Sequence, residues 1–248
     1  MGHKVSPIGF RTGITLGWKS RWFAPKAAFG DFLIEDYQIR KFIDDRLNRR
    51  PPYAAVGGID IERTRDEVRV NLQTARPGLV IGPKGAEIEK LKEAIEDMIN
   101  RKVTVNVTEV KSPELNAQLV AEAISEQFKR RAAFRRVMKQ HCEAAMANGA
   151  RGVKIICSGR LGGAELARSE KQIMGSIPLQ TLQANVDYGL AVSVTTYGTI
   201  GIKVWIFLSM FNEPEPSGPS VGSGASAPRP ARPAGPTSRQ SEPKRTRG

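Results

Sequence analysis

Hydrophobic and polar positions follow two different periods over the first 110 residues. Apolar side chains recur every three or four residues between positions 25 and 49, which predicts a helix that ends before Pro51-Pro52. Two shorter runs alternate apolar and polar positions around the turn Thr64-Arg65-Asp66, which predicts a β-hairpin. The predicted elements, in order, are a helix (25–49), two strands (59–63 and 68–72), a short apolar turn (77–81), a helix (86–100) and a strand (102–110).

The pattern changes after Ser112-Pro113. A helical period continues to about Asn148, with a predicted break at Ala132-Ala133. Beyond Gly149, three alternating runs bounded by glycines predict strands at 152–159, 191–198 and 201–209. Helices that come first and strands that follow predict a second α+β domain, with two helices and an antiparallel sheet.

The last 37 residues have no apolar period. Eight of the 16 prolines lie beyond Phe211, among glycine, serine and alanine, so we expect a disordered tail. The predicted organisation is therefore a basic N-terminal arm (1–22), a first α+β domain (23–111), a second α+β domain (112–211) and a Pro/Gly/Ser-rich basic tail (212–248).

Charge indicates the kind of partner. The formal net charge of +13 is typical of proteins that bind polyanions. Aromatic residues make up only 6% of the chain, which argues against base stacking as its main binding device. The two cysteines, Cys142 and Cys157, and the two histidines fit no metal or disulfide pattern. Cys142 and the adjacent His141 point to different faces of a helix, so both are expected to be structural. No apolar run reaches about 20 residues and no apolar signal core is present, so we expect a cytoplasmic protein without a membrane partner.

The loop Gly82-Pro83-Lys84-Gly85 opens the helix at 86–100 and has three possible interpretations. A P-loop would need Gly-Lys followed by Ser or Thr, and a dinucleotide fingerprint would need a third glycine in a parallel βαβ unit. The remaining one is the G-x-x-G loop of a KH domain, which clamps a nucleic-acid backbone. Glycines allow close approach, Lys84 supplies charge, and a helix N-terminus offers free N–H groups to phosphate.

The four residues alone favour a simple tight turn before a helix, because G-x-x-G is a short motif. The surrounding order of helix, strand, strand, short helix, loop, helix and strand is more specific, because it is the order of a prokaryotic-type (type II) KH domain. We therefore predict such a domain. Pro83 lacks an N–H donor, so the loop is stiffer and carries a single cation.

Four motifs in order resemble the bacterial small-subunit ribosomal proteins of the S-three family, from Met1 to about Phe211. The motifs are "GHKVSPIGFRTGI" (2–14), "TARPGLVIGPKG" (74–85), "RLGGAELAR" (160–168) and "TTYGTIGIKVWIF" (195–207). The resemblance implies a non-catalytic structural protein of the small subunit's head, with small-subunit ribosomal RNA, messenger RNA and neighbouring head proteins as partners. It implies no cofactor and no small-molecule substrate.

The resemblance also implies a role where messenger RNA enters the subunit, since the matching helix of the family carries basic residues associated with unwinding. The corresponding residues here are Arg135, Arg136 and Lys139 of "FRRVMKQ". At about 100° per residue they share an arc of roughly 100°, beside an apolar stripe that includes Met138 and Cys142. A charge run usually marks only a solvated helix face. The neighbouring Lys129–Arg131 cluster favours contact with phosphate.

The motif "RLGGAELAR" has two equally supported interpretations. Gly162-Gly163 could form only a hairpin turn with Glu165 paired to Arg168, or Arg160 and Arg168 could face RNA or a neighbouring protein. The candidate RNA-binding residues are Lys4, Arg11, Gly82, Lys84, Gly85, Arg131, Arg135, Arg136, Lys139, Arg160 and Arg168. A KH-type regulator acting off the ribosome is the alternative function. The absence of a nucleophile–base pair or nucleotide loop in the sequence disfavours an enzyme.

Overall fold

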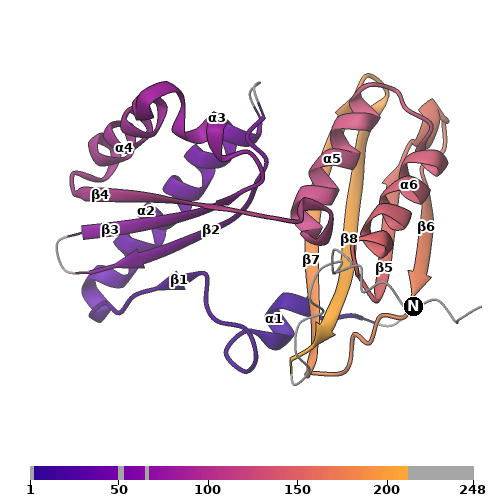
Figure 1. The fold of residues 1–248 in the computed structure, drawn as a ribbon, viewed down its shortest axis with the longest axis horizontal. Helices are drawn as coiled ribbons and strands as arrows, with labels where there is room; N and C mark the ends of the chain where they lie inside the picture. Colours follow the sequence, from indigo (N-terminus) through magenta and orange to yellow (C-terminus); the bar gives the residue numbers. More distant parts are fainter. Residues whose placement is uncertain (1–2, 50–52, 65–66, 212–248) are drawn as a thin grey trace, which may run out of the picture. The chain divides into compact units, whose positions relative to one another are not determined.

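The structure of the chain is a computed structural model, and it describes residues 3–49, 53–64 and 67–211 (Figure 1). The predicted disordered tail and the tip of the first hairpin lie outside these residues. No helix in the described ranges is both long enough and apolar enough to span a membrane.

The first sheet confirms the predicted hairpin and the strand after it. Its order is β1-β2-β3-β4, with β2 antiparallel to β3 and β3 parallel to β4. A parallel pair needs a crossover, and the chain between β3 and β4 supplies it through two helices and the glycine loop. The strands are β1 (Ser20–Arg21), β2 (Val56–Arg63), β3 (Glu67–Thr74) and β4 (Lys102–Glu109).

The helices of the first domain lie close to their predicted positions. The first predicted helix is α2 (Lys26–Ile43), which continues into a π-helical turn, η1 (Asp44–Asn48). The apolar turn is a short helix, α3 (Pro77–Ile81), and the helix after the glycine loop is α4 (Ala86–Ile99). Both long helices contribute to one core: Ile39 of α2 and Ile95 of α4 are fully buried with Ile61 of the sheet. This arrangement of helices and strands is the predicted type II KH domain.

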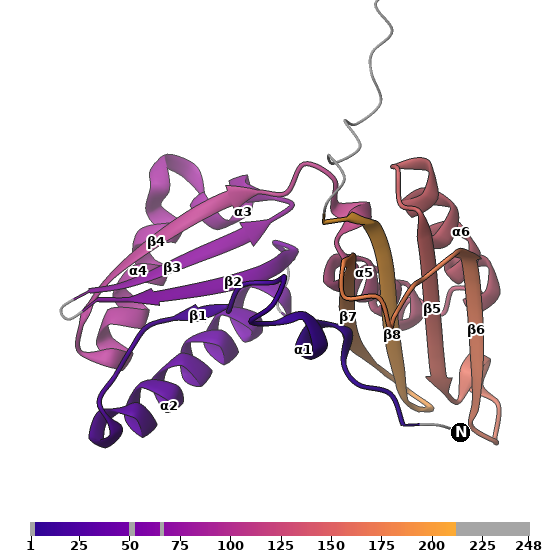
Figure 2. The same cartoon turned by 90° about the horizontal axis from the view of Figure 1, so that it is seen from below.

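The second domain has the predicted two helices and antiparallel sheet. The helices α5 (Ala117–Lys129) and α6 (Phe134–Ala147) are interrupted where the break was predicted, and they lie on one face of the sheet in both views (Figure 2). The sheet order is β6-β5-β8-β7 and every neighbouring pair is antiparallel. Its strands are β5 (Gly152–Gly159), β6 (Arg168–Gly175), β7 (Ala184–Thr195) and β8 (Gly198–Met210).

Two short elements and one edge strand were not predicted. The helix α1 (Pro7–Arg11) and the strand β1 are too short to show a period. The strand β6 lies at the sheet edge and has no fully buried residue, so its sequence lacks the alternation of a core strand. Short 3₁₀ turns, η2 (Pro83–Gly85), η3 (Pro113–Leu115) and η4 (Leu161–Gly163), complete the described elements.

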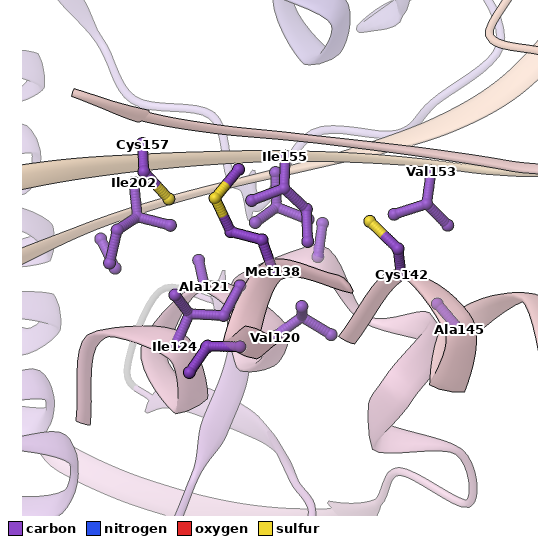
Figure 3. Close-up of a cluster of buried hydrophobic side chains, with 14 of the residues drawn as sticks. Val120, Ala121, Ile124, Met138, Cys142, Ala145, Val153, Ile155, Cys157 and Ile202 are labelled. Carbon is purple, nitrogen blue, oxygen red and sulfur yellow. The ribbon is translucent and has the colours of Figure 1, made fainter. Parts of the chain in front are cut away.

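The core of the second domain fixes how α6 is rotated about its axis (Figure 3). Met138, Cys142 and Ala145 of α6 face the sheet and pack with Ile155 and Cys157 of β5. Burial raises the pKa of Cys142 to about 11 and that of Cys157 to about 12, so both thiols remain protonated. Both cysteines therefore serve as small apolar side chains of this core.

Candidate nucleic-acid interface

The KH loop has a left-handed backbone. Gly82, Lys84 and Gly85 have φ angles of 69°, 55° and 81°. A Cβ atom on Gly82 would lie 2.7 Å from Cγ of Glu87, whereas one on Gly85 would meet nothing within 4 Å. Packing within the loop therefore requires glycine at 82. At 85 the backbone conformation favours glycine, and the space beside it is open.

The charge of this loop is smaller than the sequence motif suggests. Lys84 is exposed, but Glu87 and Glu89 lie in the first turn of α4, where carboxylates already interact with the positive end of the helix dipole. Glu87 also pairs with Lys90, at 2.8 Å between Oε1 and Nζ, and that hydrogen bond lowers the pKa of Glu87. The backbone at Gly85 is open to close approach, and the two carboxylates offset the single positive charge of the loop.

The exposed face of α6 carries the three cations that were predicted for it. Arg135, Arg136 and Lys139 are exposed, while Val137 and Met138 are buried against the core. The prediction that one face packs and the neighbouring face presents cations is confirmed.

Two of these cations have a carboxylate beside them, and sequence reasoning missed the one from another element, Glu170. Glu170 of β6 lies 3.8 Å from Nη2 of Arg135, and Glu143 lies 3.7 Å from Nζ of Lys139. Arg136 has no carboxylate within 4.0 Å among the residues that the structure describes. The side chain of Arg135 is 79% exposed, and exposed pairs of this kind contribute about 0–1 kcal/mol, so phosphate can replace the carboxylate.

The motif "RLGGAELAR" forms a turn and also presents cations. Gly162 and Gly163 lie in η4 with φ angles of 69° and 83°, as the hairpin-turn interpretation expected. The carboxylate beside Arg168 is that of Glu170, at 3.5 Å from Nε, and not that of Glu165. The guanidinium of Arg168 lies 5.6 Å from the ring centroid of Phe134, at the start of α6.

Arg160 and Arg131 lie near this turn as well. Arg160 donates from Nε to the carbonyl oxygen of Ala164 at 2.8 Å and from Nη1 to that of Tyr197 at 2.9 Å. Arg131 is exposed in the connection between α5 and α6, with a φ angle of 59°. The structure therefore gathers Arg131, Arg135, Arg160 and Arg168 at one end of the second domain, although the first two lie far from the last two in sequence.

The assignment of Arg11 to RNA binding is wrong. Its side chain is fully buried and donates from Nε to the carbonyl oxygen of Ala184 at 2.7 Å and from Nη2 to that of Thr181 at 2.9 Å. Arg11 thus holds the N-terminal arm against the segment that leads into β7. Lys4 is exposed, and its candidate role stands as a prediction.

Comparison with known proteins agrees with the architecture. A small ribosomal subunit protein uS3 of a Sulfurovum species (strain NBC37-1) is 51% identical over 221 residues, which cover 88% of this chain and 94% of that protein. This chain belongs to the uS3 family of small ribosomal subunit proteins. The uS3 of Rhodopirellula baltica is 55% identical over 208 residues, covering 83% of this chain and 88% of the relative. That of Desulforamulus reducens is 48% identical over 224 residues, covering 90% and 99%.

The family matches follow the two domains. Residues 38–115 match the KH domain family, and residues 124–206 match the C-terminal domain of ribosomal protein S3. The resemblance found in the sequence motifs is confirmed, and the chain is a structural protein of the small ribosomal subunit with an RNA-binding KH domain.

Proposed function

We propose that this protein binds ribosomal RNA in the head of the small subunit and lines the path by which messenger RNA enters, where it holds and helps to unwind the incoming strand. Its partners in this role are small-subunit ribosomal RNA, messenger RNA and neighbouring head proteins, and it carries out no catalysis. The observation that supports the unwinding role is the exposed cation row Arg135, Arg136 and Lys139 on α6.

The cation row is suited to unwinding because it lies on α6, a helix whose orientation is fixed by packing. Met138 and Cys142 fix the rotation of α6, so the three cations cannot turn away from a strand lying along the helix. Strand separation requires that cations hold the phosphates of one strand while the duplex advances, so that the duplex cannot close again. Arginine is suited to this because its charge is permanent and its planar fork can contact a phosphate with two N–H groups.

The KH loop and the N-terminal arm have a different role from the cation row. Gly82, Lys84 and Gly85 form a surface that a nucleic-acid backbone can approach closely, and Lys4 lies exposed on the arm. We assign these residues to ribosomal RNA, because static attachment needs shape and modest charge more than a dense row of cations.

The test is translation by ribosomes that carry the triple variant Arg135→Ala/Arg136→Ala/Lys139→Ala. These exposed side chains contribute little to the core, so subunits should assemble and translate unstructured messages at near-normal rates. Elongation through a stable downstream hairpin should slow selectively, and the ratio of the two rates is the measurement.

Two control variants test whether the effect depends on positive charge at these three positions or on the net charge of the protein. The charge-retaining variant Arg135→Lys/Arg136→Lys/Lys139→Arg should keep most of the wild-type ratio. The variant Lys26→Ala/Lys41→Ala/Lys92→Ala removes the same charge from exposed positions of the first domain and should leave the ratio unchanged. A wild-type ratio in the first variant, with normal assembly, would refute the unwinding role.

A regulator acting off the ribosome would be distinguished by sedimentation. We expect the native protein to remain with small subunits in high salt, since the chain belongs to a family of small-subunit proteins. Release into the free fraction would instead favour a separate KH-type RNA binder.

A further inference from the structure

A hollow of about 360 Å³ opens in the second domain beside the first residue of α6. Three of its lining residues, Phe128, Leu161 and Ile200, are buried and apolar. It is also lined by cations from separate segments, which are Lys129 at the end of α5, Arg131 just after it and Arg160 after β5. No Asp or Glu of the described chain lines it. An apolar floor below a cationic rim is suited to a ligand with a flat apolar part and a negative charge.

The guanidinium of Arg160 is already oriented to bind such a negative charge. Its Nε and Nη1 atoms donate to the carbonyl oxygens of Ala164 and Tyr197, which fixes the plane of the guanidinium. Nη2 has no protein partner within hydrogen-bond distance among residues 3–49, 53–64 and 67–211. A ligand phosphate could therefore bind this guanidinium with little further loss of side-chain conformational entropy. That loss usually opposes binding by arginine.

Tyr197 supplies a ring at the rim. It lies in the turn between β7 and β8, and the residue is 50% exposed. A Cβ atom on Gly163 would lie 3.2 Å from Cε2 of this ring, so the glycine allows the ring to approach the backbone of η4. The ring is supported on that side and still has exposed surface, as a stacking platform requires.

We propose that this hollow binds one unpaired nucleotide of an RNA strand, with the base against Tyr197 and the apolar floor and the phosphate on Arg160 and Arg131. The volume lies within the range of small-molecule sites, and a paired base cannot enter because its edges are occupied. Sequence-specific and single-strand RNA binders commonly take unstacked bases onto aromatic rings in this way.

The proposal rests on the unwinding role above and deepens it. Phe134 lines the hollow and Arg135 follows it on the cation row, so a strand held along α6 has its next nucleotide at the hollow. A base bound there cannot pair again with its former partner. The hollow would therefore retain the separated strand, while the cation row holds its phosphates.

The test uses the purified full-length protein and an RNA hairpin with a single-stranded extension that carries 2-aminopurine, a base whose fluorescence falls when it stacks. Wild-type protein should quench the probe. Tyr197→Ser should lose the quenching and bind the extended hairpin about tenfold more weakly, the effect expected from one stacked base. Tyr197→Phe keeps the ring and should stay within about twofold of wild type. A blunt duplex of equal length should bind both variants as it binds wild type.

The outcomes separate the two proposals. If Tyr197→Ser quenches and binds like wild type while Arg135→Ala/Arg136→Ala/Lys139→Ala weakens binding, the nucleotide site is refuted and the cation row stands. If the triple variant binds like wild type while Tyr197→Ser does not, the hollow holds a nucleotide without the proposed row. If Tyr197→Ser leaves RNA binding unchanged and instead lowers incorporation into subunits, the occupant is a neighbouring protein and the proposal is overturned. Circular dichroism melting of each variant confirms that the fold is retained.

Discussion

The carboxylate of Glu170 lies 3.5 Å from Nε of Arg168. The same oxygen lies 3.8 Å from Nη2 of Arg135, so one acidic residue on β6 faces two of the candidate RNA-binding cations. In an RNA-free protein this carboxylate reduces repulsion between the two guanidinium groups. A phosphate that approached either guanidinium would compete with this carboxylate for it.

We predict that Glu170→Gln strengthens RNA binding by about two- to fivefold at low salt, because exposed ion pairs of this kind are worth up to about 1 kcal/mol. The advantage should shrink as salt is raised, since screening weakens both the pair and the phosphate contacts. Titration of the full-length protein with single-stranded RNA at several salt concentrations measures both effects. Glu165→Gln, an exposed acid of the preceding turn, is the control and should change affinity less. Equal gains from both variants would mean that only net charge matters.

A second prediction concerns the buried pair between α2 and β2. Nη2 of Arg63 lies 2.6 Å from Oδ1 of Asp36, and the two side chains are only 2% and 5% exposed. Ser20 and Trp22 also donate hydrogen bonds to Asp36, at 2.9 Å and 2.8 Å. Removing the arginine leaves a buried carboxylate without its counter-charge, so Arg63→Met should lower the free energy of unfolding of the first domain by about 3–5 kcal/mol.

Urea denaturation measures this loss, and the exposed pair between Arg21 and Glu62 provides the control. These two side chains are 3.5 Å apart and largely solvent-accessible, so Arg21→Met should cost about 1 kcal/mol or less. Similar losses in the two variants would contradict the structural role of the buried pair.

A third prediction follows from the corrected role of Arg11. Arg11→Met removes donors from several backbone carbonyl oxygens, including those of Ala184 and Thr181, and should destabilise the second domain by about 2 kcal/mol or more. The salt dependence of RNA binding should be unchanged, because the buried guanidinium contacts no phosphate. Lys4→Ala should have the opposite pattern, with unchanged stability and a smaller salt slope. A reduced salt slope in Arg11→Met at full stability would restore Arg11 to the RNA-binding set.

A fourth prediction separates shape from charge in the KH loop. Lys84→Ala should reduce the slope of log affinity against log salt by about 0.7, the value for one phosphate on a single strand. Gly82→Val should weaken binding more, because its side chain would collide with Glu87 and displace the loop. Pro83→Lys adds a cation and an N–H donor and should strengthen binding. If all three variants bind single-stranded RNA like wild type, the loop is only a structural turn.

The local elements of the fold could be predicted because each has its own period. The hairpin of β2 and β3 and the break between α5 and α6 are confirmed within a few residues. The strand β6 could not be predicted, because an edge strand that buries no residue fully carries no alternation.

The candidate site was predictable in its residue types and not in its pairings. The cation row on α6 follows from helical period alone, and the packed face beside it is confirmed. The burial of Arg11 and the position of Glu170 depend on contacts across more than 30 residues of sequence, which no local pattern encodes. Long-range contacts of this kind decide whether an arginine is a binding residue or a structural one.

A last prediction concerns pH and Glu122 of α5. The pKa of Glu122 is raised from 4.5 to about 7, mainly by burial and to a smaller extent by nearby Asp44, and a hydrogen bond from Gln118 to Oε1 at 2.8 Å opposes the shift. Between about pH 4.5 and 7 the folded protein holds a proton on Glu122 that the unfolded chain has released. Raising the pH through this range therefore favours unfolding, and the stability contributed by the protonated acid is lost as the pH passes 7.

Glu122→Gln mimics the protonated acid, since its amide oxygen still accepts the hydrogen bond from Gln118. We expect the variant to match wild type in urea denaturation near pH 5 and to be more stable by on the order of 1–3 kcal/mol at pH 8. Other titrating groups are common to both proteins and cancel in the difference. Glu126→Gln, on the same helix, controls for the loss of one negative charge. The contrary result would be a difference in the free energy of unfolding, between wild type and Glu122→Gln, that is the same at pH 5 and pH 8. Glu122 would then be ionised in the folded protein throughout this range, with water solvating its carboxylate.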